Sequence, residues 1–543
     1  MKEKKRFRYL IMLLASVFVL SACSSKDKPS GAGDKVLHIV KDTDIKTLDG
    51  SLATDGISFE VLTAMTDGLI AYDKDGVVVP RIAKDWTISD DGLTLTFNLR
   101  DDAKWSNGDA VTANDFVYSW RRTVDPATKA EYALIIADAG IKNAAAITAG
   151  DLPVTDLGVA ADGDHTLVVT LSASVPYILE LLTFPTFYPM NEKFVTEKGD
   201  SYAKSKDDLI SNGPFVLTEW TPGSSWALAK NADYYDADAV KIDGLDFKLL
   251  SDYQTAALEF DNGKVDFTKI SSDLVSRYKG KDEFKQQPLG FLWYIAPNQS
   301  KPELQNADLR LALGYAIDRD HIVNDIMADG SLAADYVVPV GLAVGPDDKD
   351  FRDTADRYLA FDLAKAQEHL DKAKEALGKS SFEFDLLIED SQESRTNAEA
   401  IQADLAELDG LSIKITTLPK SERLDRMKAG DYELGLTRWG PDYADPYTFL
   451  GTLFTKDSPY NYARYDNPAF DTLVLKTGAG GELSTDPAAR WQAFKDVEKI
   501  LLDEAGIIPI WQSSDALIQS KRVSGIEMHV VGITSYRNVV IAD

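Results

Sequence analysis

The sequence predicts an α/β protein that carries a turn-rich α+β block in its first third. After residue 290 the patterns predict strand–helix alternation: strand 382–388, helix 397–408, strand 412–417, helix 422–429 and strand 432–437. Such alternation is typical of a mostly parallel sheet covered by helices. Between residues 73 and 190, Asp-Gly and Asn-Gly pairs instead separate runs in which apolar and polar residues alternate, which indicates hairpins.

The other elements follow from local patterns in chain order. The apolar run 36–40 predicts a strand, and residues 57–71 predict a helix that ends near Gly68. Thr112 followed by Asp115 before an apolar face predicts a capped helix start. Further on we expect a strand at 291–295, one helix over 306–327 and a helix capped by Asp362.

Length and composition exclude several classes of protein. The 543 residues correspond to roughly three domains of about 100–200 residues each. The net charge of −29 argues against nucleic acid as a partner, because phosphate contacts need clustered Lys and Arg. The one Cys can form neither an internal disulfide nor a thiolate metal site, and the five His are scattered. We therefore expect no metal and no cofactor.

The N-terminus has the pattern of an export signal. Five basic residues within 2–8 precede an apolar run over 9–20, which is too short for a spanning helix. The string Leu-Ser-Ala-Cys that ends at Cys23 closely resembles a bacterial lipobox, which implies a signal peptide over 1–22 and a lipidated Cys23. Residues 23–35 then form a flexible tether. The alternative is an ordinary signal peptide with a chance Cys.

Motifs that suggest catalysis are loose. Ser-x-x-Lys occurs three times and Lys476-Thr-Gly once, which partly mimics the penicillin-binding set, but no Ser-Asp-Asn accompanies them. Asp73-x-Asp75-Gly76 matches only the beginning of a calcium loop. No glycine-rich phosphate loop and no Gly-x-Ser-x-Gly is present. We therefore expect a protein that is not an enzyme, and keep a cell-surface enzyme as the competing class.

The segment 431–446 carries the functional hypothesis. It runs off the end of a predicted strand, so Trp439, Asp442 and Tyr443 emerge where ligands bind in open α/β sheets. An aromatic surface beside a carboxylate suits a cationic head group with an apolar body. The alternative is turn chemistry alone, with Pro-Asp and Asp-Pro pairs closing a loop.

Several longer motifs resemble the peptide- and nickel-binding extracellular proteins of bacterial ABC importers, and most closely their oligopeptide-binding lipoproteins. The matching segments are 95–108 with 111–120, the turn Ser-Asn-Gly-Pro-Phe at 211–215, 306–319, Phe-Asp at 361–362 and Trp-Gly-Pro-Asp-Tyr-Ala-Asp-Pro at 439–446. The resemblance covers residues 36–543. It implies a two-lobed periplasmic-binding-protein-like fold with a hinge, and an extra α+β domain inserted in the first lobe.

The implied boundaries agree with the change of pattern along the chain. The resemblance places lobe I at 36–72, 191–288 and 508–543, the inserted domain at 73–190 and lobe II at 289–507. The resemblance also implies that two chain crossings join the lobes and that a peptide ligand lies between the two lobes.

The resemblance also assigns site residues. Asp442 matches the carboxylate that holds the peptide's α-amino group. Arg438 replaces a glycine of the family pattern, so it could bind a ligand carboxylate or pair with Asp445. We expect the peptide to lie as an added strand, with main-chain contacts near Trp439 and near residues 294–298, which include Asn298.

Tyr132 and Trp439 are expected to form aromatic walls, and Tyr443 is expected to contact the ligand. The expected partners are oligopeptides, the permease subunits of an ABC importer and a membrane reached through the lipid anchor. We expect the protein to be a monomer. We also expect it to lie outside the cytoplasm, on a Gram-positive cell surface. Alternatives within the family are a dipeptide, haem or nickel-chelate binder, or a peptide-pheromone receptor.

Overall fold

The structure is a computed structural model that describes residues 35–542. The predicted signal peptide, Cys23 and the tether up to residue 34 lie outside the described residues. Residues from Val36 onward form one compact unit. No helix within 35–542 is long and apolar enough to cross a membrane.

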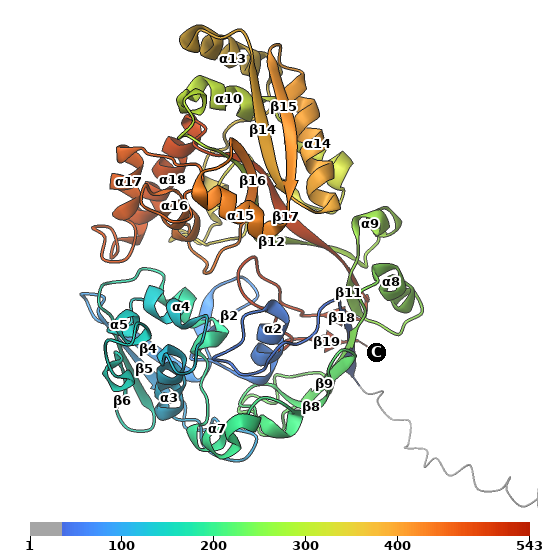
Figure 1. Ribbon diagram of the computed structural model, residues 1–543. Helices are drawn as coiled ribbons and strands as arrows, with labels where there is room; N and C mark the ends of the chain where they lie inside the picture. Colours follow the sequence, from blue (N-terminus) through green and yellow to red (C-terminus); the bar gives the residue numbers. More distant parts are fainter. Residues whose placement is uncertain (1–34, 543) are drawn as a thin grey trace, which may run out of the picture. The chain divides into compact units, whose positions relative to one another are not determined.

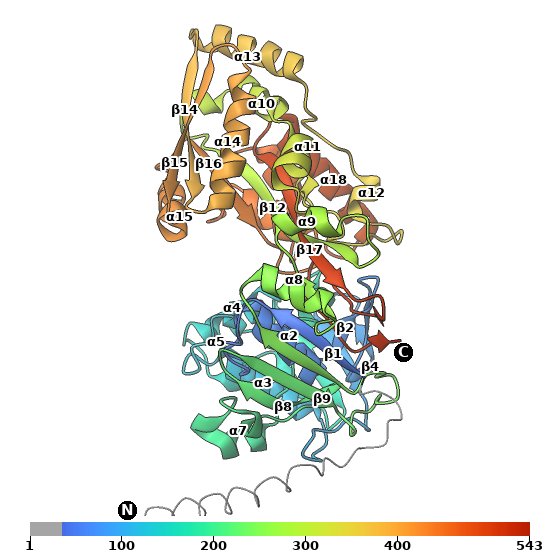
Figure 2. The same cartoon turned by 90° about the vertical axis from the view of Figure 1, so that its right-hand side faces the viewer.

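An eleven-stranded mixed sheet runs through this unit in the order β15-β14-β16-β12-β17-β11-β1-β10-β9-β8, and β13 pairs with β17 (Figures 1 and 2). Its strands are β1 Val36–Lys41, β8 Phe215–Thr221, β9 Ser225–Lys230, β10 Gly244–Leu249, β11 Phe267–Lys269, β12 Phe284–Pro297, β13 Leu332–Ala333, β14 Phe382–Glu389, β15 Leu411–Leu418, β16 Leu434–Trp439 and β17 Ile508–Gln519.

The two longest strands, β12 and β17, lie side by side in the middle of this sheet and belong to both of its halves. They pair antiparallel from Phe284–Ile518 to Ile295–Ile508, with an irregular register between Pro288 and Leu292. Beyond β12 the sheet continues through β16, and beyond β17 it continues through β11. Such an irregularity is typical of places where paired strands bend.

Buried apolar side chains form three main clusters. The first extends over residues 292–511, and the second over 69–187 together with Tyr443. The third combines residues from 37–65, 203–267 and 517–541. The chain therefore passes between clusters within β12 and within β17, because Trp511 lies in the first cluster and Leu517 in the third.

The first cluster is built by β14, β15 and β16 with the helices that the chain forms between β12 and β17. These helices are α10 Ala307–Ala316, α11 Arg319–His321, α12 Phe351–Thr354, α13 Leu363–Leu377, α14 Gln392–Ala406, α15 Lys420–Ala429, α16 Tyr447–Phe454, α17 Pro468–Leu475 and α18 Pro487–Asp503. β14 is parallel to both β15 and β16, whereas β12 is antiparallel to β16. Strands β14, β15 and β16 form one parallel part of the sheet, and β1 with its neighbours β10 and β11 forms the other.

The second cluster fills an α+β block with its own antiparallel sheet, ordered β4-β5-β7-β6. Its elements are β2 Ile70–Tyr72, β3 Val78–Pro80, β4 Ala83–Ile88, β5 Thr94–Leu99, β6 Val159–Ala161, β7 Thr166–Thr170, α3 Ala113–Val124, α4 Ala133–Asp138, α5 Ala144–Thr148 and α6 Ile178–Leu182. The expected cap of α3 is confirmed, because Thr112 and Asp115 form a capping box.

Short helices cover the third cluster and two smaller apolar clusters. These are α2 Gly56–Met65, α7 Glu192–Lys198, α8 Tyr253–Asp261 and α9 Ser272–Tyr278, with a terminal pair of strands β18 Val523–Ser524 and β19 Val540–Ile541. Single 3₁₀ turns occur at Val154–Asp156, Pro185–Phe187, Gly199–Ser201, Lys206–Asp208 and Glu303–Gln305.

Two predicted helices were too long. The helix expected over 57–71 ends at Met65, and the chain then extends through Thr66 into β2. The helix expected over 306–327 is interrupted after Ala316, where the side chain of Asp318 accepts from the His321 N–H and caps a new turn. That turn continues as a π-helix over Ile322–Met327.

The turn at residues 211–215 holds the segment that follows α2. The Asn212 side chain accepts from the Asp67 N–H at 2.9 Å and donates to the Asp67 carbonyl at 3.2 Å. The Gly213 N–H donates to the Met65 carbonyl at 2.8 Å. A Cβ added to Gly213 would lie 2.7 Å from backbone atoms of Met65 and Thr66. The two chain segments are therefore in direct backbone contact.

We expect Gly213→Ala to lower the free energy of unfolding by about 1–3 kcal/mol, because the added methyl group must displace backbone. Gly56→Ala is the matched control, since a Cβ there meets nothing within 4 Å. It should be neutral or stabilise α2 by up to about 1 kcal/mol. Urea unfolding of both variants measures the difference, and equal stabilities would contradict the close backbone approach.

Candidate ligand-binding cleft

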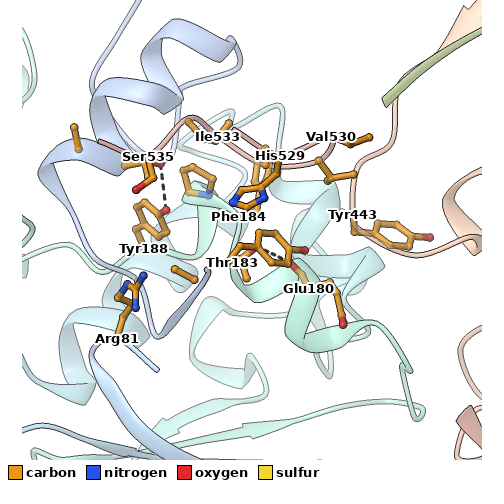
Figure 3. Close-up of a pocket in the computed structure, with 18 of the residues that line it drawn as sticks. Arg81, Glu180, Thr183, Phe184, Tyr188, Tyr443, His529, Val530, Ile533 and Ser535 are labelled. Atoms are coloured by element: carbon orange, nitrogen blue, oxygen red, sulfur yellow. Dashed lines mark hydrogen bonds between the residues drawn. The ribbon is translucent and has the colours of Figure 1, made fainter. Parts of the chain in front are cut away.

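A cavity of about 290 Å³ is lined by segments that lie far apart in the sequence. They come from residues 63–72, 180–188, 289–291, 441–443 and 529–537. Figure 3 shows Arg81 and Tyr188 on one side of this cavity and Tyr443 on the other. All three apolar clusters contribute to its walls, so the cavity lies where they meet.

Asp442 lines this cavity from the loop that follows β16. Its backbone N–H donates to the Thr448 hydroxyl at 3.2 Å, and within residues 35–542 its carboxylate has no hydrogen bond or ion pair. The side chain is exposed, although protein surrounds it on several sides. Reduced hydration, with the nearby charge of Asp138, raises the pKa of Asp442 to about 6. An unpaired carboxylate in such a position favours a cationic ligand group.

Tyr132 lies within electrostatic reach of Asp442. Burial, together with the charge of Asp442, raises the pKa of the Tyr132 hydroxyl. Its ring stacks on Phe184, a cavity residue, with centroids 5.5 Å apart. The structure thus brings Tyr132 and Asp442 to the same region. Asp138 also lies there, at the end of α4, and no spacing in the sequence indicates it.

Trp439 is the last residue of β16 and lies opposite Leu292 of β12. Its ring is half-buried and packs against Tyr460, with centroids 4.8 Å apart. On its other edge β16 pairs with β14 only at Leu434 and Gly435. The backbone of Trp439 and of the residues just before it therefore has a neighbouring strand on the β12 side alone.

Tyr443 is a buried residue of the loop after β16. Its side chain is 8% exposed and stacks on Tyr177 with ring centroids 4.3 Å apart. Tyr177 belongs to the α+β block, so this stack joins the loop after β16 to that block. Tyr443 also lines the cavity, and its main contact is this ring stack.

The loop is held by a buried ion pair between Asp445 and Arg490. Two guanidinium nitrogens of Arg490 donate to the two carboxylate oxygens of Asp445 at 2.6 and 2.7 Å. The third donates to the Thr477 carbonyl at 2.6 Å. The expected alternative pairing of Arg438 with Asp445 is therefore wrong, because Arg490 occupies both oxygens.

Arg438 is exposed and points to aromatic rings. Its guanidinium carbon lies 5.1 Å from the ring centroids of Phe291 and Trp293. It forms no ion pair with any other residue of the described part of the chain. Phe291 lines the cavity, so Arg438 lies at the cavity's edge.

The structure places Asn298 outside the residues that line the cavity. The side chain is fully buried, and its amide donates to the carbonyls of Gly430 and Tyr432 at 3.0 and 2.8 Å. Its carbonyl oxygen accepts from Ser300. Within β12, Tyr294 and Ile295 pair with both β16 and β17, whereas Ala296 and Pro297 pair with β16 alone. The Asn298 side chain therefore holds a turn, and contact of this residue with a peptide stays a prediction.

The charged cavity residues that the sequence patterns did not indicate include Asp67, Arg81, Glu180 and Arg537. Glu180 on α6 has one carboxylate oxygen that is buried without a partner, and burial raises its pKa to about 7. Arg81 follows β3 and lines the other side. Residues 35–542 contain no group of three or more His, Cys, Asp or Glu side chains that could hold a metal ion.

The similarity to relatives extends over nearly the whole chain. A dipeptide-binding protein of Lactococcus lactis is 33% identical, with 98% of each chain covered. An oligopeptide-binding protein of Bacillus subtilis is 30% identical, with 98% of this chain and 99% of the relative covered.

Solved structures agree in fold. A peptide-bound oligopeptide-binding protein of Listeria monocytogenes has a TM-score of 0.71 at 34% identity, covering 94% of this chain and all of the other. The unliganded open form of a murein tripeptide-binding protein, which is from Escherichia coli, has a TM-score of 0.82 at 26% identity, covering 94% and 99%. Residues 77–461 match the sequence profile described as bacterial extracellular solute-binding proteins, family 5. The chain therefore belongs to family 5 of the bacterial extracellular solute-binding proteins.

Proposed function

We propose that this protein captures peptides in the cleft around Asp442 and delivers them to an ABC importer. The observation that carries the proposal is the Asp442 carboxylate, which faces the cavity without a partner in the described residues. The names of the relatives support a peptide as the solute. Dipeptides, other small solutes and peptide pheromones remain alternatives within the same family.

In this proposal Asp442 binds the α-ammonium of the peptide. A carboxylate that has lost part of its hydration forms a strong charge-assisted hydrogen bond with an ammonium group. The peptide main chain then adds to the open edge of β16 beside Thr437–Trp439, which β14 leaves free. Main-chain pairing reads what all peptides share, so one site accepts many sequences.

Aromatic side chains complete the proposed site. Trp439 and Tyr132 form apolar walls near Asp442, and Tyr443 fixes the loop through Tyr177. Arg438, held over Phe291, is a proposed contact for acidic groups that leave the cavity. Space that side chains leave empty is filled by water, which supplies the remaining hydrogen bonds.

We propose the division into lobe I, inserted domain and lobe II given above, with the two crossings inside β12 and β17. The TM-score is higher to an open, unliganded structure than to a peptide-bound one, although the sequence identity is lower. This difference supports a cleft that is open before it binds. Bending of β12 and β17 would then close the lobes on the ligand and form the surface that the permease recognises.

The lipid anchor belongs to the proposal as well. Lipidation of Cys23 would hold a monomeric protein at the outer face of the cell membrane by acyl chains. The binding role also implies that the bound peptide leaves unchanged. Recovery of intact labelled peptide after incubation supports a binding protein, whereas release of fragments would support the surface enzyme.

We expect Asp442→Asn to weaken binding of peptides with a free N-terminus by about 2–3 kcal/mol, at the lower end of the values for truncated charge pairs, because Asn keeps the shape and one acceptor. N-acetylated peptides lack the α-ammonium, so they should bind the wild type poorly and lose little more in the variant. Titration calorimetry on ligand-free protein gives all four affinities. Equal losses for both peptide forms would show that Asp442 only shapes the loop.

Binding should also depend on pH through the raised pKa of Asp442. The ionised carboxylate binds the ammonium, so affinity is half of its full value at the pKa, is nearly full above about pH 7 and falls as protonation increases below the pKa. With a pKa of about 6, affinity at pH 5 should be about tenfold lower than at pH 7.5. The Asp442→Asn variant should show a flat profile over this range, and a parallel decline in both proteins would assign the titration to another group.

We expect Cys23→Ala to leave residues 35–542 folded and to release the protein from the membrane. The reason is that a thioether to lipid at this position is the one anchor the sequence predicts. Fractionation of cells that express either form measures the soluble share, and circular dichroism checks the fold. Retention of the Cys23→Ala protein in the membrane fraction would disprove the lipoprotein assignment.

A further inference from the structure

The cavity contains charged groups of both signs, and two of them are already paired. Asp67 accepts hydrogen bonds from the hydroxyls of Tyr234 and Tyr235, both at 2.7 Å. Arg537 is bound to Asp236 and to the Tyr234 hydroxyl. Since the Asp67 carboxylate and the Arg537 guanidinium already have hydrogen-bond or ion-pair partners within the protein, neither group requires a ligand as its partner.

Arg81 has no such partner. The one hydrogen bond of its guanidinium goes to the carbonyl of its own neighbour, Pro80, at 3.0 Å. Within residues 35–542 it forms no ion pair, although acidic residues outnumber basic ones by 87 to 58 in the whole chain. The side chain is half-buried and lines the cavity. A partly dehydrated guanidinium without a counter-charge is costly, so such groups are normally paired.

Glu180 does not serve as that counter-charge. Its carboxylate interacts with the Asp445–Arg490 pair, whose charges act on its pKa. Figure 3 shows Glu180 on the side of Tyr443, away from Arg81. The cavity therefore has an unpaired cation at one side and the unpaired Asp442, next to Tyr443, at the other.

We infer that Arg81 binds a carboxylate group of the ligand. This inference rests on the proposed peptide-binding function and makes it more specific: Asp442 takes the ammonium and Arg81 takes the acid group of the same ligand. The planar guanidinium offers two parallel N–H donors that match the two oxygens of a carboxylate.

Two sources could supply the carboxylate, namely the C-terminus of a short peptide or an acidic side chain of a longer one. The experiment uses ligand-stripped, refolded protein and native mass spectrometry with randomised tripeptide libraries. One library has free C-termini and one has amidated C-termini. Two further amidated libraries contain a fixed Glu or a fixed Gln at the third position.

Arg81→Gln should lower retention of the free-acid library about 10- to 100-fold, and Arg81→Lys should restore part of it. The amidated library should bind wild type and Arg81→Gln alike, which assigns the carboxylate to the C-terminus. A loss confined to the amidated Glu library, with the Gln library unaffected, would also support the inference and would assign the carboxylate to a side chain.

Arg121→Gln is the matched control, because it removes the same charge from a residue that donates to the Thr155 carbonyl and does not line the cavity. It should change none of the affinities. Equal retention of every library by wild type and Arg81→Gln would overturn the inference and leave the proposed function intact. If folded wild-type protein retains no library at all, the proposed function fails and the inference fails with it.

Discussion

The site depends on the buried ion pair of Asp445 and Arg490. Both side chains are less than 10% exposed, and the contact is bidentate. Removing one partner of such a pair typically costs about 3–5 kcal/mol, because the other charge stays buried without compensation. The pair fixes one end of the loop after β16 on α18, and the stack of Tyr443 on Tyr177 fixes its middle. Asp442 can therefore stay unpaired at a defined position, since its neighbours hold the loop.

The opposite wall is held by a different device. The turn at 211–215 clamps the chain after α2 by main-chain and amide hydrogen bonds, so Asp67 and Gly68 line the cavity in a fixed conformation. Both walls thus use interactions that are complete within the protein. Within residues 35–542, Asp442 and Arg81 line the cavity without a charged partner, and one carboxylate oxygen of Glu180 also lacks a hydrogen bond. The walls of such a site are preorganised by internal hydrogen bonds and ion pairs, and the charged groups without partners are available to a ligand.

Much of the fold follows from local patterns. Alternation along the chain predicts β14, β15 and their helices, and the capping box at Thr112 predicts the start of α3. The helix break at Asp318 is set by a distant contact, because the Asp318 N–H donates to Asp404. For the site, the loop pattern points to Trp439 and Asp442. The sequence does not show that the Asn298 amide bonds to the carbonyls of Gly430 and Tyr432. Arg81 was missed because an isolated arginine after a short strand has no distinctive pattern.

The central claim is that the Asp442 cleft holds peptides by their free N-termini. The most direct test is native mass spectrometry of the full-length protein extracted from its own cells, with fragmentation of any mass that is released on denaturation. The account predicts a heterogeneous set of short peptides with unblocked N-termini, which is depleted when the Asp442→Asn protein is extracted in the same way. Release of one non-peptide compound, or of N-terminally blocked peptides in equal amounts from both proteins, would contradict it.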